Sequence, residues 1–272
     1  DCKGLLALHI AVLTTLKKFN IRLNRDLYLV STAGEEEGGT IGASRLLERH
    51  PDLKKAKYVL SEGGGFRFET NTANYQLCQV GEKGRLGIII NSKIKNKHIL
   101  RYAHKTAEEY NYDNKLAKTA SGAGRLDIER IFSNNILQKG NKLTFETLPD
   151  LDLQNVLTTF HTYIKRNDPD ADIKIIELVD GKTSPTDTLL YQAIKNKTRE
   201  KADAFLIPYI TPGYSDNRFF RNSGIVVYGY QPLLTDCKPS WIHGIGERIS
   251  LDSLNFGIQL LFDIITSAFS EQ

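Results

Sequence analysis

Three consecutive glutamates, Glu35, Glu36 and Glu37, follow an apolar run and lead directly into two glycines. Carboxylates packed this closely repel one another, so burying them requires a compensating cation. The ordinary alternative is a solvated acidic turn, in which water screens each carboxylate. This stretch on its own therefore allows two interpretations, a cation site or an exposed turn.

Other potential metal ligands occur where predicted strands end. They are Asp1, Glu62 and His243, and the last two are each followed directly by glycine. Carboxylate and imidazole ligands without a thiolate suit catalytic zinc or a similar divalent ion. These residues favour the cation site over the exposed turn.

The composition is typical of a globular protein. The 272 residues can bury a sizeable core as one large domain or two, and 40% are hydrophobic and 25% charged. The net charge of +4 comes with scattered lysines, so no basic stripe indicates a nucleic-acid partner. No apolar run is long enough to span a membrane, and no signal-peptide pattern opens the chain. The three cysteines, Cys2, Cys78 and Cys237, form no ligand pairs, so we expect a reducing, cytoplasmic compartment.

The first part of the chain alternates between predicted helices and strands. In order these are a helix, a strand, a helix and a strand: Cys2–Phe19, Leu27–Ser31, Thr40–Arg49 and Lys57–Leu60. Such alternation predicts a parallel α/β sheet. Ligands bind such sheets at the carboxyl ends of the strands, where Glu35, Glu36 and Glu62 fall.

The middle of the chain has a different pattern. Strands predicted at 75–80, 86–95 and 173–179, with helices at 98–110 and 151–165, indicate a second, α+β domain inserted at residues 86–180. The α/β pattern then resumes and ends in a helix at 251–269. We therefore expect an α/β fold with a mainly parallel sheet sandwiched by helices, formed by residues 1–85 and 181–272.

Six short motifs follow one another along the chain: Asp1–Gly4, Thr32–Gly39, Ser61–Gly64, Gly81–Gly84, Gly213–Phe220 and His243–Ile249. In this order they resemble the di-zinc metallopeptidases that include aminoacylase, carboxypeptidase S, carnosinase-type dipeptidases, acetylornithine deacetylase and succinyl-diaminopimelate desuccinylase. The likeness covers nearly the whole chain and is weakest in the insert. The Gly-Glu-Lys-Gly and Arg-Phe-Phe runs place it nearest to the carboxypeptidase S branch. The resemblance implies a zinc-exopeptidase-like fold whose inserted domain serves as a lid and a dimerisation domain.

The resemblance also implies two divalent metal ions, expected to be zinc. Asp1 would bridge them, Glu36 and His243 would complete one site, and Glu62 would belong to the other. Glu35 would be the general base that takes a proton from a metal-bridging water. The family carries one more ligand in a His-x-Asp motif upstream of the bridging aspartate. Either the natural protein contains that motif before Asp1, which we expect, or the metal site is incomplete.

Five further residues correspond to substrate contacts in this family. His98 falls where a lid histidine stabilises the tetrahedral oxyanion, although a surface histidine opening a helix is the alternative. Arg218 would bind a substrate carboxylate, with Gly213 and Ser215 lining the same pocket, unless it forms an ordinary surface ion pair. Asn141 matches a lid asparagine, but the Ile-Pro turn that follows it in the family is absent.

These observations predict a metal-dependent hydrolase that cleaves an amide or peptide bond beside a free carboxylate. A carboxypeptidase, a dipeptidase and an N-acyl-amino-acid deacylase all fit, acting on a small peptide or an N-acyl amino acid. We expect a homodimer formed through the inserted domain, with no nucleic-acid or membrane partner. The alternatives are an inactive binding protein on the same scaffold and a single-metal or regulatory-metal protein. Glu35 favours an enzyme, since a binding protein needs no general base.

Overall fold

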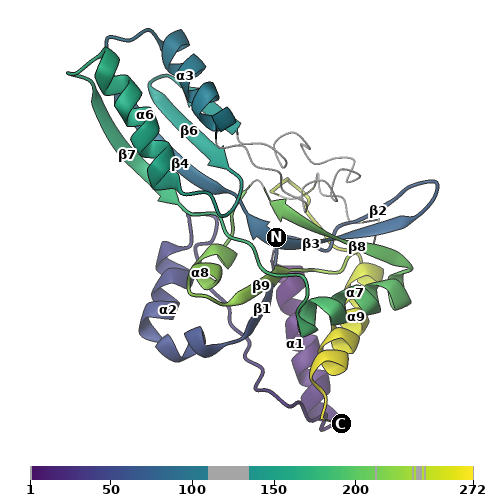
Figure 1. Cartoon of the computed structure of the whole chain (residues 1–272). Helices are drawn as coiled ribbons and strands as arrows, with labels where there is room; N and C mark the ends of the chain where they lie inside the picture. The colour runs from purple at the N-terminus through teal and green to yellow at the C-terminus, as the bar shows by residue number, and fades with distance from the viewer. Residues whose placement is uncertain are drawn as a thin grey trace. The chain divides into compact units, whose positions relative to one another are not determined.

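A computed structural model describes residues 2–109, 135–211, 213–234, 236, 241 and 243–271. The chain divides into two compact units, drawn in Figure 1. The first unit comprises residues 1–80, 184–209 and 215–272, and the second comprises residues 81–183 and 210–214. Each unit is described by itself below.

The first unit is built on a sheet in the strand order β1-β9-β3-β2, with β8 also pairing with β3. The strands are β1 (Tyr58–Ser61), β2 (Arg67–Glu69), β3 (Asn74–Glu82), β8 (Ala204–Thr211) and β9 (Val226–Gly229). β1 and β9 are parallel, whereas β3 is antiparallel to both β2 and β9. Because β1 ends at Ser61, Glu62 is the first residue beyond its carboxyl end.

Three helices supply most of the apolar packing of this unit. They are α1 (Lys3–Lys18), α7 (Leu189–Ala202) and α9 (Leu251–Phe269), and α9 contacts both of the others, as Figure 1 shows. α9 begins where the side chain of Ser250 accepts a hydrogen bond from the Ser253 amide, an ordinary N-cap. Its buried positions recur every three or four residues: Gly257, Leu260, Leu261, Ile264, Ile265 and Ala268. This periodicity explains why the predicted helix at 251–269 is confirmed at both ends.

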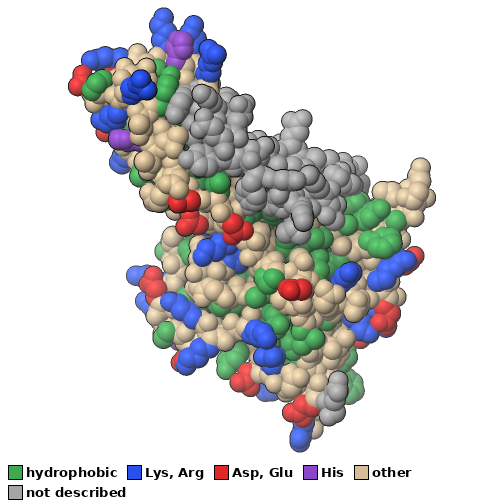
Figure 2. All heavy atoms as spheres, in the orientation of Figure 1, with side chains coloured by type: hydrophobic (Ala, Val, Ile, Leu, Met, Phe, Trp, Pro, Cys, Tyr) green, Lys and Arg blue, Asp and Glu red, His purple; other side chains and the backbone are tan. Residues whose placement is uncertain are grey.

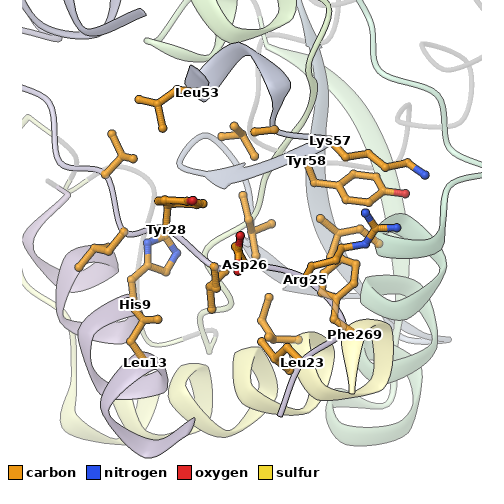
Figure 3. A pocket seen from close by; sticks show the side chains of 18 of the residues that line it. His9, Leu13, Leu23, Arg25, Asp26, Tyr28, Leu53, Lys57, Tyr58 and Phe269 are labelled. Carbon is orange, nitrogen blue, oxygen red and sulfur yellow. The ribbon is translucent and has the colours of Figure 1, made fainter. Parts of the chain in front are cut away.

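The predicted buried strand at Leu27–Ser31 is wrong. Residues 26–32 form no strand, and Tyr28 is 70% exposed. Residues of this segment, Leu27 to Val30, instead border a cavity of 830 Å³ together with α1, α9 and the start of β1 (Figure 3). A buried parallel strand needs hydrogen-bonded neighbours along its edges, and no described strand pairs with this segment. An apolar run alone could not show that this condition fails.

Shorter helical segments lie near the acidic residues. A π-helical turn at Thr40–Ser44 continues into α2 (Arg45–Arg49), so the predicted helix at 40–49 is present with an irregular first turn. A 3-10 helix follows at Pro51–Lys55. The six-residue α8 (Asn217–Asn222) precedes β9.

The second unit contains an antiparallel sheet in the order β5-β6-β4-β7, with two helices, α3 and α6, packed against each other. The strands are β4 (Gly84–Asn91), β5 (Asn135–Lys139), β6 (Lys142–Thr147) and β7 (Asp172–Val179), and the helices are α3 (Asn96–Glu109) and α6 (Leu153–Asn167). Its core includes Phe145 of β6 against Phe160 of α6, with ring centroids 5.3 Å apart in an edge-to-face arrangement. The predicted fold class, α/β with an inserted α+β unit, is confirmed.

The surface agrees with the charge pattern of the sequence. On the face shown in Figure 2, lysine and arginine side chains lie interspersed with acidic ones. None of the described helices is both long enough and apolar enough to cross a membrane.

Candidate metal centre

The acidic residues Glu35 and Glu36 lie in a tight turn directly before the π-helical turn at 40–44. The turn closes through hydrogen bonds from the Gly38 amide to the Glu35 carbonyl and from the Gly39 amide to the Gly34 carbonyl, both 2.8 Å. Gly39 has a φ of +63° and packs so closely against α8 that a Cβ atom there would lie 1.9 Å from Oδ1 of Asp216. The glycines therefore allow the turn to approach the start of α8.

Glu35 is partly buried among other carboxylates. Burial is the first cause that raises its pKa to about 7, and the charges of Glu62, Glu36 and Asp216 raise it further. Arg218 opposes the shift but does not cancel it. A carboxyl group with a pKa near neutrality can both accept and return a proton, as a general base must.

Glu36 and His243 are 207 positions apart in the sequence, yet their side chains are in contact. Nε2 of His243 lies 2.9 Å from Oε1 of Glu36, and the two side chains are 63% and 61% exposed. The structure thus brings together the two residues that the resemblance assigned to one metal ion. Glu62 contacts a different residue, Cys2. The Sγ of Cys2 donates a hydrogen bond of 3.1 Å to Oε2 of Glu62.

The described residues suit a divalent metal in their chemistry. Within the described ranges no three or more histidine, cysteine, aspartate or glutamate side chains form a ready-made ligand group, and Asp1 lies outside those ranges. The donors that do converge are carboxylates and one imidazole, which are hard or borderline ligands. The charges of Glu62, Glu36 and Asp216 contribute to the raised pKa of Glu35, so negative charge gathers around this residue. A divalent cation would neutralise that charge.

Three consecutive residues at the start of α8 contact the acidic loops. Oδ2 of Asp216 accepts a hydrogen bond of 2.7 Å from Oγ1 of Thr32, and Nη2 of Arg218 donates one of 2.6 Å to the Gly38 carbonyl. Nδ2 of Asn217, between them, donates a hydrogen bond of 3.0 Å to the backbone carbonyl of Glu62. The sequence analysis missed Asp216 and Asn217, although both stand inside the motif that contains Arg218.

The other predicted substrate contacts have local partners. Ser215 is buried, and its Oγ accepts a hydrogen bond of 3.3 Å from the Asn217 amide, while Gly213 is exposed. In the second unit, His98 is exposed near the start of α3. Asn141 lies in the turn between β5 and β6, where its Nδ2 donates a hydrogen bond of 3.0 Å to Oδ1 of Asn91.

Comparisons with known proteins place the chain in a family and a fold. The model of peptidase family M20/M25/M40 matches residues 1–267. A metallo-carboxypeptidase of Sulfolobus solfataricus is similar in structure, with a TM-score of 0.66 and 15% identity over 96% of this chain and 74% of that one. A di-peptidase of Saccharomyces cerevisiae has a TM-score of 0.65 and 14% identity over 98% and 71% of the two chains. A dinuclear metal-binding peptidase of Bacillus subtilis has a TM-score of 0.56 and 13% identity over 94% and 68%. No curated protein matches the chain in sequence.

Proposed function

Because the chain belongs to peptidase family M20/M25/M40, we propose that it hydrolyses an amide or peptide bond that lies beside a free carboxylate. The observation that carries this proposal is the convergence of acidic residues from separate parts of the chain: the charges of Glu62 and Glu36 both act on Glu35, and His243 contacts Glu36. Three kinds of substrate fit this description: those of a carboxypeptidase, those of a dipeptidase, and N-acyl amino acids. The similarity to a metallo-carboxypeptidase and a di-peptidase supports the first two classes.

The proposed cofactor is a pair of divalent ions, with zinc as the expected metal. Glu36 and His243 would hold one ion, Glu62 the other, and Asp1 would bridge them. Support comes from the contact between Glu36 and His243 and from the dinuclear metal site of the Bacillus subtilis relative. When bound, such ions polarise a substrate carbonyl and acidify water.

The remaining chemistry falls to the protein's own residues. Glu35 would take a proton from the attacking water and then deliver it to the leaving nitrogen. Arg218 would bind the substrate carboxylate, with Gly213 and Ser215 beside it. His98 would donate to the developing oxyanion and Asn141 would contact the substrate, as the resemblance implies.

The proposed assembly is a homodimer formed through the inserted domain. Among the described strands β7 lies at an edge of the sheet, and this supports the proposal, since Ile175, Ile176 and Leu178 on it are 46%, 39% and 39% exposed. An apolar strand at the edge of a sheet is a ready surface for pairing with another chain. The proposal of a cytoplasmic location rests on the cysteines alone, of which Cys2 and Cys78 are not joined in a disulfide.

The decisive experiment compares the natural full-length protein with its Glu35→Gln variant in metal content and in hydrolysis of a panel of dipeptides and N-acyl amino acids. We expect about two metal ions per chain in both proteins. The turnover number should fall by roughly 10²- to 10⁴-fold in the variant, because the carboxylate that accepts the proton is gone. Glu37→Gln is the matched control, since Glu37 belongs to the same acidic triplet and should leave turnover unchanged.

Two results would decide against this function. If the full-length protein binds metal but hydrolyses nothing in the panel, the inactive binding protein becomes the better account. If it binds a single ion per chain, the single-metal alternative is supported instead.

A further inference from the structure

The loop that carries Glu62 is held by an unbroken series of hydrogen bonds. Each of the five backbone carbonyls from Ser61 to Gly65 accepts at least one. The donors, in order along the chain, are the Tyr230 amide at 2.7 Å, Asn217 Nδ2 at 3.0 Å, the Tyr209 hydroxyl, the Gln231 amide at 3.1 Å and Gln76 Nε2 at 3.0 Å. Three of the five donors are side chains, so residues distant in sequence set the path of this loop.

Asn217 is the side chain that holds Glu62 itself. It is fully buried, and its Nδ2 donates both to the Glu62 carbonyl at 3.0 Å and to Oε1 of Gln79 at 2.7 Å. An amide nitrogen has two N–H donors, so this pair of contacts uses both of them. Because both acceptors are oxygens, the orientation of the amide is fixed by its surroundings.

Gln79 is fixed in turn from the same short helix. Its Oε1 also accepts a hydrogen bond of 3.0 Å from Nη2 of Arg221, one turn after Asn217 on α8. Gln79 and Arg221 are 1% and 4% exposed. Asn217 takes part in this buried network through its two N–H donors, while its Oδ1 has no partner among the described residues. Replacing Asn217 would therefore leave the Glu62 carbonyl without its side-chain donor, at the cost of an unmet hydrogen bond.

We propose that Asn217 is a positioning residue that fixes the Glu62 loop for metal binding. The proposal rests on the function proposed above, in which Glu62 is a metal ligand. The residues on either side of Asn217 act on the other acidic loop, since Asp216 accepts from Thr32 and Arg218 donates to Gly38. One tripeptide therefore sets the spacing between Glu62 and the loop that carries Glu35 and Glu36. Residues that orient ligands in this way commonly change metal affinity by 10- to 100-fold when they are replaced.

The test measures two properties of Asn217→Leu, which keeps the branched shape of the side chain and removes both donors, and of Asn217→Ala. The first is hydrogen–deuterium exchange of peptides covering residues 60–66 in the metal-free full-length protein. The second is the affinity for Zn²⁺, measured by calorimetric titration. We expect roughly tenfold faster exchange in this loop and a 10- to 100-fold weaker affinity for one of the bound ions.

Thr188→Val is the matched control. Thr188 is part-buried in the first unit, where its hydroxyl shares a hydrogen bond of 2.6 Å with the Tyr228 hydroxyl and accepts one of 3.2 Å from the Tyr191 amide, and none of the five donors to the Glu62 loop contacts it through these bonds. This isosteric change should lower thermal stability by an amount comparable to the Asn217 variants. It should alter neither exchange at residues 60–66 nor zinc affinity, so a general loss of stability cannot mimic the expected result.

The outcomes separate this inference from the proposed function. If zinc affinity depends on Glu62 but is unchanged in folded Asn217 variants, the positioning role is overturned while the metal site stands. If the unaltered protein binds no zinc, both the proposed metal site and the role assigned here to Asn217 fall. Should either Asn217 variant not fold, the other, together with the exchange measurement, still decides the question.

Discussion

The environment of Glu35 is created by residues from distant parts of the chain. Glu62 follows β1, and Asp216 directly precedes α8, yet the charges of both reach Glu35. In an unfolded chain only Glu36 and Glu37 would be near, and water would screen them. The pKa of about 7 is therefore a property of the folded site and not of the acidic triplet.

We predict that Glu62→Gln lowers the pKa of Glu35 in the metal-free protein, because it removes the strongest neighbouring like charge. The pKa should stay above 4.5, since burial contributes most to the shift. The measurement is an NMR titration of the glutamate carboxyl carbons. A pKa of Glu35 that is the same in both proteins would contradict the electrostatic account.

The same shift sets the sign of a stability effect. The folded pKa of Glu35 lies above its ordinary value, so the folded protein binds more protons than the unfolded chain between about pH 4.5 and 7. The free energy of unfolding of the metal-free protein should therefore decrease as the pH rises through this window. Glu35→Gln should remove that decrease, while Glu37→Gln should retain it.

At the scale of elements, a helix of six residues connects the two acidic loops. α8 is too short to be stable alone, and its position depends on what it contacts. Gly39 packs tightly against this helix. A Cβ atom built at Gly39 would lie 1.9 Å from Asp216 and 2.8 Å from the ring of Phe219. Tight packing, more than helix propensity, holds this element.

We predict that Gly39→Ala destabilises the protein by about 1–3 kcal/mol more than Gly224→Ala does. Both glycines have positive φ, +63° and +84°, so alanine is strained at either position. Only Gly39 is also crowded, since no atom lies within 4 Å of a Cβ built at Gly224. Denaturant unfolding of the metal-free proteins measures the difference, and equal losses would show that the close approach to α8 has no energetic weight.

At the scale of the whole molecule, the sheet of the second unit has an apolar strand at one edge within its described residues. In the second unit, β7 forms one edge of the described sheet and exposes three large apolar side chains. The register between β7 and β4 shifts at a bulge beside Ile176, so Leu178 opposite Leu86 and Ile175 opposite Ile88 share a face of the sheet. The burial of this edge by a second copy would explain why apolar residues stand there.

We predict that the double substitution Ile175→Lys with Leu178→Lys weakens self-association by at least tenfold, because it places two charges on the apolar edge. Leu251→Lys is the control, since Leu251 is 76% exposed at the start of α9 in the first unit. Sedimentation velocity over a range of concentrations measures the dissociation constants. A dimer that tolerates the β7 substitutions would place the interface elsewhere.

The sequence by itself determined the fold class, most element positions and the candidate acidic residues. Helices such as α9 follow from the local spacing of apolar residues, and the glutamates stand out by their types alone. The same local reasoning misplaced Leu27–Ser31 as a strand, because it counts apolar residues but cannot see whether a neighbouring strand pairs with them.

Only the tertiary structure decided which residues meet. Glu36 contacts His243, Arg218 contacts Gly38 across 180 positions of sequence, and Asn217 reaches Glu62 across 155. No local pattern encodes such contacts, since they arise when separate segments pack around one core. The sequence thus determined the chemical types available for a metal centre, and tertiary packing decided how the loops that carry them are held.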